Sequence, residues 1–118
     1  MATGNAHSVA KLYGILANGG SLGKKTLMSP STIELQAQPI KSGKDKNIKV
    51  PVTYGRGYVI IKSPKDSVQF GTPGMGGQIG FSDLKYKLGI GVHLQLHCHD
   101  WAHRPQILIA CRIHLQNC

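Results

Sequence analysis

The sequence predicts an α+β domain in which an antiparallel sheet carries helices packed on one face. Two observations lead to this fold class. Apolar residues recur at steps of three and four over the first part of the chain, and at every second position from Tyr54 onward. With 118 residues the chain has material for about one domain with a modest core.

Two helices are expected near the start of the chain, and both have recognisable ends. The first begins after Asn5, whose side chain can accept an amide hydrogen bond as an N-cap, and it ends at residues 18–20, where two glycines favour a left-handed cap. A shorter helix begins after Ser29 with Pro30 in its first turn, and it ends before Pro39.

Strands follow the helices. The period of strands is found at residues 56–62, 78–83 and 88–96. The last two strands form a hairpin through residues 84–87. Before the strands, residues 41–49 are expected to form a polar surface loop. In such a sheet, the unpaired backbone groups of an edge strand would tend to pair with another strand. We therefore expect them to pair with a portion absent from this chain or with a second copy.

The composition of the chain changes near His93. We expect residues 1–92 to form a partial domain and residues 93–118 to be an atypical tail, which holds five of the six histidines and all three cysteines. His97, His99 and His103 could approach a metal ion. Their spacing does not match a zinc signature, so we expect a solvated cluster and neither metal nor cofactor.

The net charge of +9 raises the question of an anionic partner. The basic residues are spread along the chain, and the densest group, at residues 41–49, contains no aromatic residue on which a base could stack. We therefore expect a solvated loop, no membrane binding and no nucleic acid. No run of 18 apolar residues and no secretory leader is evident, which makes a cytoplasmic protein the default expectation.

A serine followed three residues later by a lysine is the sequence pattern of one class of hydrolase nucleophile, because on a helix the amine lies beside the hydroxyl. The pattern occurs three times here, at Ser8–Lys11, Ser21–Lys24 and Ser82–Lys85. A pattern so loose has little specificity, and we expect a structural role for all three pairs.

Three segments carry a resemblance to a known family: "GNAHSVAKLYGILANGG", "SPSTIELQAQP" and "FGTPGMGGQIGFSDLKYKLGIGV". In this order and spacing they resemble the C-terminal part of the serine beta-lactamase-related family, which includes class C-like esterases and penicillin-binding-protein relatives. The resemblance covers residues 3–92. It implies an incomplete C-terminal portion of the beta-lactamase/transpeptidase-like fold.

The resemblance also implies a site in the glycine-rich segment, where family members line a catalytic cleft with bare backbone. The third-motif positions would be Thr72, Pro73 and Gly74, and the substrate-binding positions Met75, Gly76 and Gly77, with the amide of Met75 in the oxyanion hole. Thr72 departs from the Lys or His of the family, and a neutral hydroxyl cannot supply their positive charge.

The family's nucleophilic Ser-x-x-Lys lies well upstream of the matched part, and its Tyr-x-Asn occurs nowhere in this sequence. We therefore expect a C-terminal fragment of a serine hydrolase that performs acyl transfer on small ester or amide substrates when intact and is inactive alone. The alternative is a non-catalytic basic binding or interaction protein. Whether this chain is itself an enzyme stays open at this point.

Overall fold

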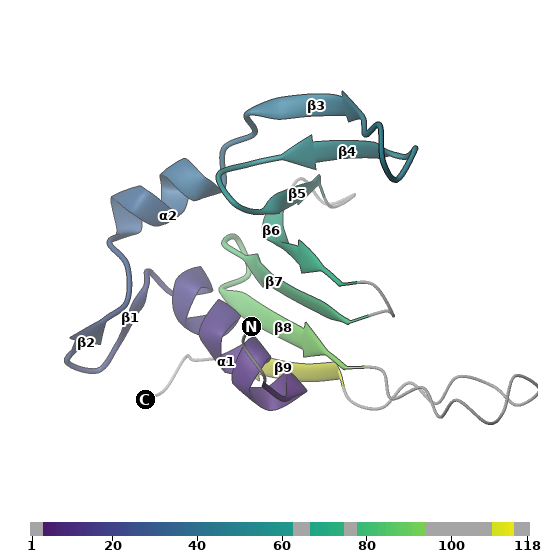
Figure 1. Cartoon of the computed structure of the whole chain (residues 1–118). Helices are drawn as coiled ribbons and strands as arrows, with labels where there is room; N and C mark the ends of the chain where they lie inside the picture. Colours follow the sequence, from purple (N-terminus) through teal and green to yellow (C-terminus); the bar gives the residue numbers. More distant parts are fainter. Residues whose placement is uncertain (1–3, 63–66, 75–77, 94–109, 115–118) are drawn as a thin grey trace, which may run out of the picture.

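The computed structural model describes residues 4–62, 67–74, 78–93 and 110–114, the last group by its backbone alone. Two helices and nine strands lie in these ranges: α1 Ala6–Ala17, β1 Ser21–Leu22, β2 Lys25–Thr26, α2 Pro30–Gln36, β3 Lys41–Lys44, β4 Pro51–Tyr54, β5 Val59–Lys62, β6 Val68–Pro73, β7 Ile79–Asp83, β8 Leu88–Val92 and β9 Ala110–His114. Strands β3 to β9 form an antiparallel sheet in sequence order, and β1 and β2 form a separate small hairpin. The expected α+β class is confirmed (Figure 1).

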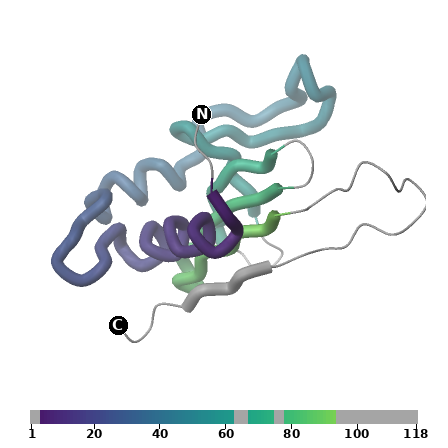
Figure 2. Tube along the Cα trace, turned by 60° about the horizontal axis from the view of Figure 1, so that its bottom comes forward, coloured from purple at the N-terminus to yellow at the C-terminus, as the bar shows by residue number. Residues whose placement is uncertain are grey.

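Helix α1 lies along one face of the sheet, over β7 and β8 (Figure 2). Its predicted ends are confirmed. The side chain of Asn5 accepts the amide hydrogen of Ser8 at 2.8 Å, and Gly19 and Gly20 follow the helix with φ values of 92° and 80°. Asn18 also donates its side-chain amide to the carbonyl of Lys87 at 3.1 Å, which ties the end of α1 to the β7–β8 turn.

The helix can lie so close to the sheet because three strand positions have no side chain. We call Gly80, Gly89 and Gly91 the glycine surface. A Cβ atom added to Gly89 would lie 2.0 Å from the backbone nitrogen of Gly14, and one added to Gly91 would lie 2.4 Å from the carbonyl oxygen of Ala6. Backbone meets backbone there, so no larger residue fits without moving the helix.

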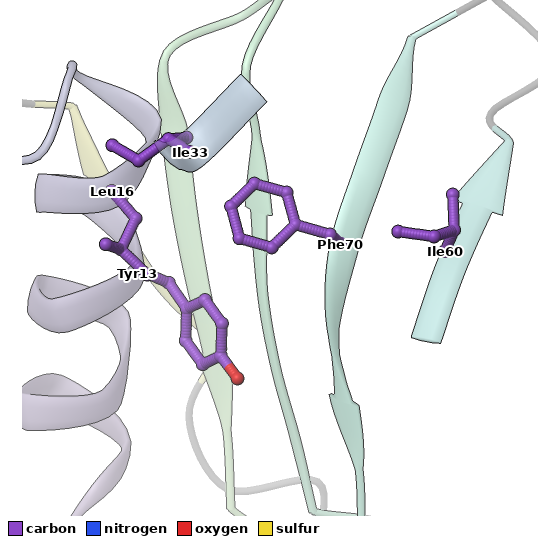
Figure 3. Close-up of a cluster of buried hydrophobic side chains, with 5 residues drawn as sticks. All are labelled: Tyr13, Leu16, Ile33, Ile60 and Phe70. Carbon is purple, nitrogen blue, oxygen red and sulfur yellow. The ribbon is translucent and has the colours of Figure 1, made fainter. Parts of the chain in front are cut away.

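The core lies beside this contact, between the two helices and the sheet. It consists of Tyr13, Leu16, Ile33, Ile60 and Phe70 (Figure 3). Tyr58 joins the cluster edge-on, with its ring centroid 5.2 Å from that of Phe70 and 6.3 Å from that of Tyr13. Such aromatic pairs add about 0.5–1.5 kcal/mol beyond the burial of their surface. Helix α2 enters the core through Ile33, and its predicted cap at Ser29 is confirmed.

The expected loop at residues 41–49 is wrong in its first half. Lys41–Lys44 form β3, which pairs with β4, a strand that the periodicity did not reveal. All four residues of β3 are exposed, since it is an edge strand with no buried face. Without a buried face there is no alternation of apolar and polar residues to read.

Parts of the other strand predictions are also corrected. The strand expected from residue 56 begins at Val59, because the preceding residues form the β4–β5 connection, and β6 was not expected as a separate strand. The strand expected over residues 88–96 ends at Val92, His93 follows it outside any strand, and residues 94–96 lie outside the described part.

Little of the predicted tail, residues 93–118, is described. Its backbone at Ala110–His114 adds β9 beside β8, with Gly91 opposite Cys111. The histidines proposed as metal ligands, His97, His99 and His103, lie outside the described residues. The division after residue 92 therefore stays a prediction. Within the described ranges no helix is long and apolar enough to cross a membrane.

Candidate functional site

The predicted motif lies where β6 leaves the sheet. Thr72 is paired with Gly80 and Pro73 with Ile79, and the amide of Gly74 donates to the carbonyl of Gln78 at 2.7 Å to close the start of the β6–β7 connection. Thr72, Pro73 and Gly74 are all exposed. The predicted substrate-binding positions Met75, Gly76 and Gly77 fall in that connection and lie outside the described residues.

The first turn of α1 lies at the same end of the sheet. Ala6 packs over Gly91, next to the end of β8. Val92 of β8 is paired with Ile79 of β7, and Ile79 is paired with Pro73 of β6, so the three strand ends lie side by side. The motif and the first turn of α1 thus lie at the same end of the sheet, with β7 between β6 and β8.

Tyr13 connects α1 to the motif. Its phenol lies within interaction range of both the side chain and the backbone of Thr72. Burial raises the pKa of the Tyr13 hydroxyl, the interactions with Thr72 lower it in part, and the neighbouring Tyr58 raises it further. The net effect is a neutral phenol at ordinary pH, which lies beside the end of β6 and does not act as a base.

This role of Tyr13 was missed from the sequence, where the residue fitted the apolar face of the first helix. A buried tyrosine usually has a partner for its hydroxyl, and that expectation is the one clue the sequence offers. The partner itself comes from a strand far along the chain.

The serines of the three serine-lysine pairs lie in surroundings that fit a structural role. Ser82 is fully buried, and its hydroxyl donates to the carbonyl of Tyr13 at 2.6 Å. Ser21 lies in β1, with its hydroxyl 3.1 Å from that of Thr26. Ser8 and Lys11 are exposed on the side of α1 that faces away from the glycine surface. None of these serines faces the motif at Thr72.

Asp83 organises the turn that follows β7. Its carboxylate accepts hydrogen bonds from the hydroxyl of Ser67 at 2.7 Å, from the side-chain amide of Gln69 at 2.9 Å and from the backbone of Tyr86 at 3.0 Å. Burial opposes ionisation of this group, but the donors outweigh it and the pKa of Asp83 is lowered. A carboxylate satisfied in this way supports the hairpin and is not available as a general base.

No group of three metal-ligating side chains occurs within the described ranges. An open hollow of about 390 Å³ lies between β3, β4 and β5 and is lined by residues including Ser42, Thr53 and Lys62.

Neither a family model nor a curated protein matches the chain. Among solved structures, a family VIII carboxylesterase is similar with 38% identity and a TM-score of 0.68 over 75% of this chain and 25% of that one. A penicillin-binding protein homolog from Caulobacter crescentus is similar with 27% identity and a TM-score of 0.62 over 70% of this chain and 24% of that one. The chain thus spans about a quarter of the length of these structures. The predicted resemblance is confirmed, and with it a relationship to serine hydrolases of the beta-lactamase fold.

Proposed function

The chain belongs to the serine beta-lactamase-related family over the part that these comparisons cover, and from that premise we propose that it supplies one wall of an acyl-transfer cleft. The substrates of such a cleft are small esters or amides. The wall consists of the motif positions Thr72, Pro73 and Gly74 and the substrate-binding positions Met75, Gly76 and Gly77.

One observation supports this assignment most directly. At Thr72–Gly74 a strand end lies beside the Tyr13 phenol, finishes in a glycine and is open to solvent. A glycine at the strand end lets a carbonyl group approach the backbone closely. Pro73 has no amide hydrogen and that of Gly74 donates to Gln78, so the proposed donor to the charge that develops on the carbonyl oxygen is the amide of Met75. Removing one such donor typically costs about 100-fold to 1,000-fold in rate.

The nucleophile comes from another polypeptide segment in this proposal. A serine hydroxyl on that segment attacks the carbonyl carbon, a base on the same segment takes the proton, and the alcohol or amine leaves before water releases the acyl group. The serines of the three serine-lysine pairs do not have the surroundings that this role needs, because Ser82 is buried, Ser21 lies beside Thr26 in a separate hairpin and Ser8 is exposed away from the sheet. The chain alone is therefore inactive.

A fluorophosphonate probe tests this proposal, because it reacts covalently with activated serines. We expect no labelling of the purified chain. Mixing the chain with the remaining part of the similar family VIII carboxylesterase, from which the matching quarter has been removed, should restore hydrolysis of a nitrophenyl ester.

Two variants serve as controls for this experiment. Ser8→Ala should leave the restored hydrolysis unchanged, whereas Thr72→His should raise it by about tenfold or more, since histidine supplies the missing proton transfer. Stoichiometric labelling of Ser8 in the chain alone would overturn the proposal.

A further inference from the structure

The hairpin of β3 and β4 projects from the sheet. Strand β4 is paired with β5 at a single position, Tyr54 opposite Val59, whereas β3 and β4 are paired at four. The open hollow described above separates the rest of the hairpin from β5. In Figure 1 the two strands extend along the upper margin of the molecule and end in a connecting turn beyond the neighbouring strands.

The turn has a defined shape. We call residues 44–50 the hairpin tip. The amide of Asp45 donates to the carbonyl of Val50 at 2.9 Å, and the amide of Lys49 donates to the carbonyl of Asp45 at 3.0 Å. The Asp45 carboxylate accepts the amide hydrogens of Asn47 at 2.7 Å and Ile48 at 3.0 Å. It also accepts the hydroxyl hydrogen of Tyr54 at 2.7 Å. The single acidic group of the tip is thus used to hold the turn together.

The remaining side chains of the tip face outward. Lys44, Lys46 and Lys49 are exposed, and none of them forms an ion pair within the part of the chain that the structure describes. Two aliphatic side chains are exposed among them, with Ile48 at 58% and Val50 at 48%. Neither belongs to the core cluster. The tip therefore combines lysines that form no ion pair with a described residue with apolar groups on a projecting turn.

We propose that the hairpin tip docks on an anionic lipid bilayer, with the lysines at the headgroups and Ile48 and Val50 inserted into the interface. Lipid phosphates and carboxylates attract lysines near the surface, and the boundary below them accepts aliphatic side chains. A nucleic acid offers the charge but not the apolar layer. It would also favour several exposed aromatic rings on which bases stack, whereas residues 44–50 contain none and Tyr54, 38% exposed, lies in β4 outside the tip.

This inference departs from the expectation drawn from the sequence, which was a solvated loop at residues 41–49 and no membrane binding. Pairing of β3 with β4 changes that, because it gathers the three lysines and the two aliphatic residues at one end of a projecting hairpin. The inference does not depend on the proposed function, since the hairpin tip contains none of the motif positions.

Flotation of the full chain with vesicles tests the proposal. We expect binding to phosphatidylcholine vesicles that contain phosphatidylserine and little binding to phosphatidylcholine alone. Replacing two tip lysines by Lys46→Gln and Lys49→Asn should lower the partition coefficient by about tenfold or more. Asparagine is chosen at position 49 because it tolerates the left-handed backbone there, where φ is 61°.

A matched pair of lysines in the other hairpin separates local docking from general attraction. Lys24→Gln with Lys25→Asn removes the same charge at β1 and β2 and should change the partition coefficient by less than about threefold. A third variant, Ile48→Ser with Val50→Ser, keeps every charge and should reduce the binding that survives in high salt. Circular dichroism of each variant verifies that its fold is retained.

Three results would overturn the proposal. The first is equal binding to both kinds of vesicle, or to neither. The second is an equal loss from the two lysine pairs, which would mean that net charge alone attracts the chain. The third is tighter binding to a single-stranded oligonucleotide than to anionic vesicles at the same salt concentration, which would assign the tip to nucleic acid.

Discussion

At the scale of single residues, the packing of α1 depends on the absence of a side chain at Gly89. Replacing it by alanine would place a Cβ atom 2.0 Å from the backbone nitrogen of Gly14 and 2.4 Å from the carbonyl oxygen of Ala10. Neither atom can move without moving the helix. We expect Gly89→Ala to lower the free energy of unfolding by about 3 kcal/mol, measured by urea denaturation.

The matched control is Gly4→Ala, since no atom lies within 4 Å of the Cβ that it would add. We expect it to change the free energy of unfolding by less than about 0.5 kcal/mol. Equal losses from both variants would show that the close contact between α1 and β8 does not limit stability.

A second residue-scale prediction concerns the pH dependence that Asp83 causes. Its hydrogen bonds lower its pKa in the folded chain relative to the unfolded value of about 3.9. A lowered pKa contributes stability above the unfolded value, and this contribution is lost as the pH falls through the folded value. We expect the free energy of unfolding to fall below about pH 4, and the fall to be shallower in Asp83→Asn.

Asp45→Asn is the control for this measurement. The pKa of Asp45 is also lowered, chiefly by the backbone of Ile48, but its carboxylate is solvated and belongs to a surface turn. Urea denaturation over a series of pH values gives the slope of the free energy of unfolding against pH. We expect Asp45→Asn to change this slope less than Asp83→Asn does. The reverse order would assign the pH dependence to the hairpin tip.

At the scale of elements, the β3–β4 turn contains a residue in an unfavourable conformation. Lys49 has a φ of 61°, in the region where side chains other than glycine and asparagine are rarely found. We expect Lys49→Gly to raise the free energy of unfolding by about 1 kcal/mol because glycine adopts this conformation without a steric penalty.

Lys46→Gly removes the same charge from the same turn, at a position that does not have a positive φ. Glycine there adds flexibility to the unfolded chain and relieves no backbone strain, so we expect a small loss of stability. Thermal melts of the two variants should therefore shift in opposite directions.

The elements differ in how well the sequence predicted them. Helices α1 and α2 were predicted with their caps, because Asn5 and Ser29 bind amides only three residues away. Strand β3 was missed because its four residues are exposed and carry no pattern. What defines that strand is its pairing with β4, which depends on the whole hairpin.

The candidate site, like the elements, could be predicted only where local sequence was sufficient. Thr72, Pro73 and Gly74 could be selected from the sequence, because the resemblance covers the segment that contains them. The proximity of Tyr13 to Thr72 could not be predicted, since it joins a helix to a strand from distant parts of the chain. Residue types are a local property, whereas the contacts that orient them belong to the tertiary structure.

At the scale of the whole molecule, the sheet has two unlike faces. The helices and the core cover one face, whereas on the other Ile61 is 42% exposed and Ile79 37% exposed. Phe81 and Ile90, paired across β7 and β8, share that second face and are half-buried. Apolar groups gathered on an open face favour association and dye binding.

Isoleucines on the two faces of the sheet test this asymmetry. Ile61→Ser, together with Ile79→Ser, should reduce the fluorescence of bound anilinonaphthalene sulfonate with little change in unfolding free energy. Ile60→Ser removes a side chain that is only 5% exposed, and it should destabilise the chain by about 3 kcal/mol or more. Similar melting temperatures for the two variants would contradict the assignment of faces.

The glycine surface has a consequence for how such a chain can change over generations. Alanine is already too large at Gly89 and Gly91, so selection for a folded product alone would retain glycine at both positions, whatever the chain does. The steric demand is weaker at Thr72, which is exposed, and at Gly74, where an added Cβ atom would lie 3.3 Å from the carbonyl oxygen of Gln78. Among descendants that have lost catalysis but still fold, the first pair should therefore persist while the second drifts.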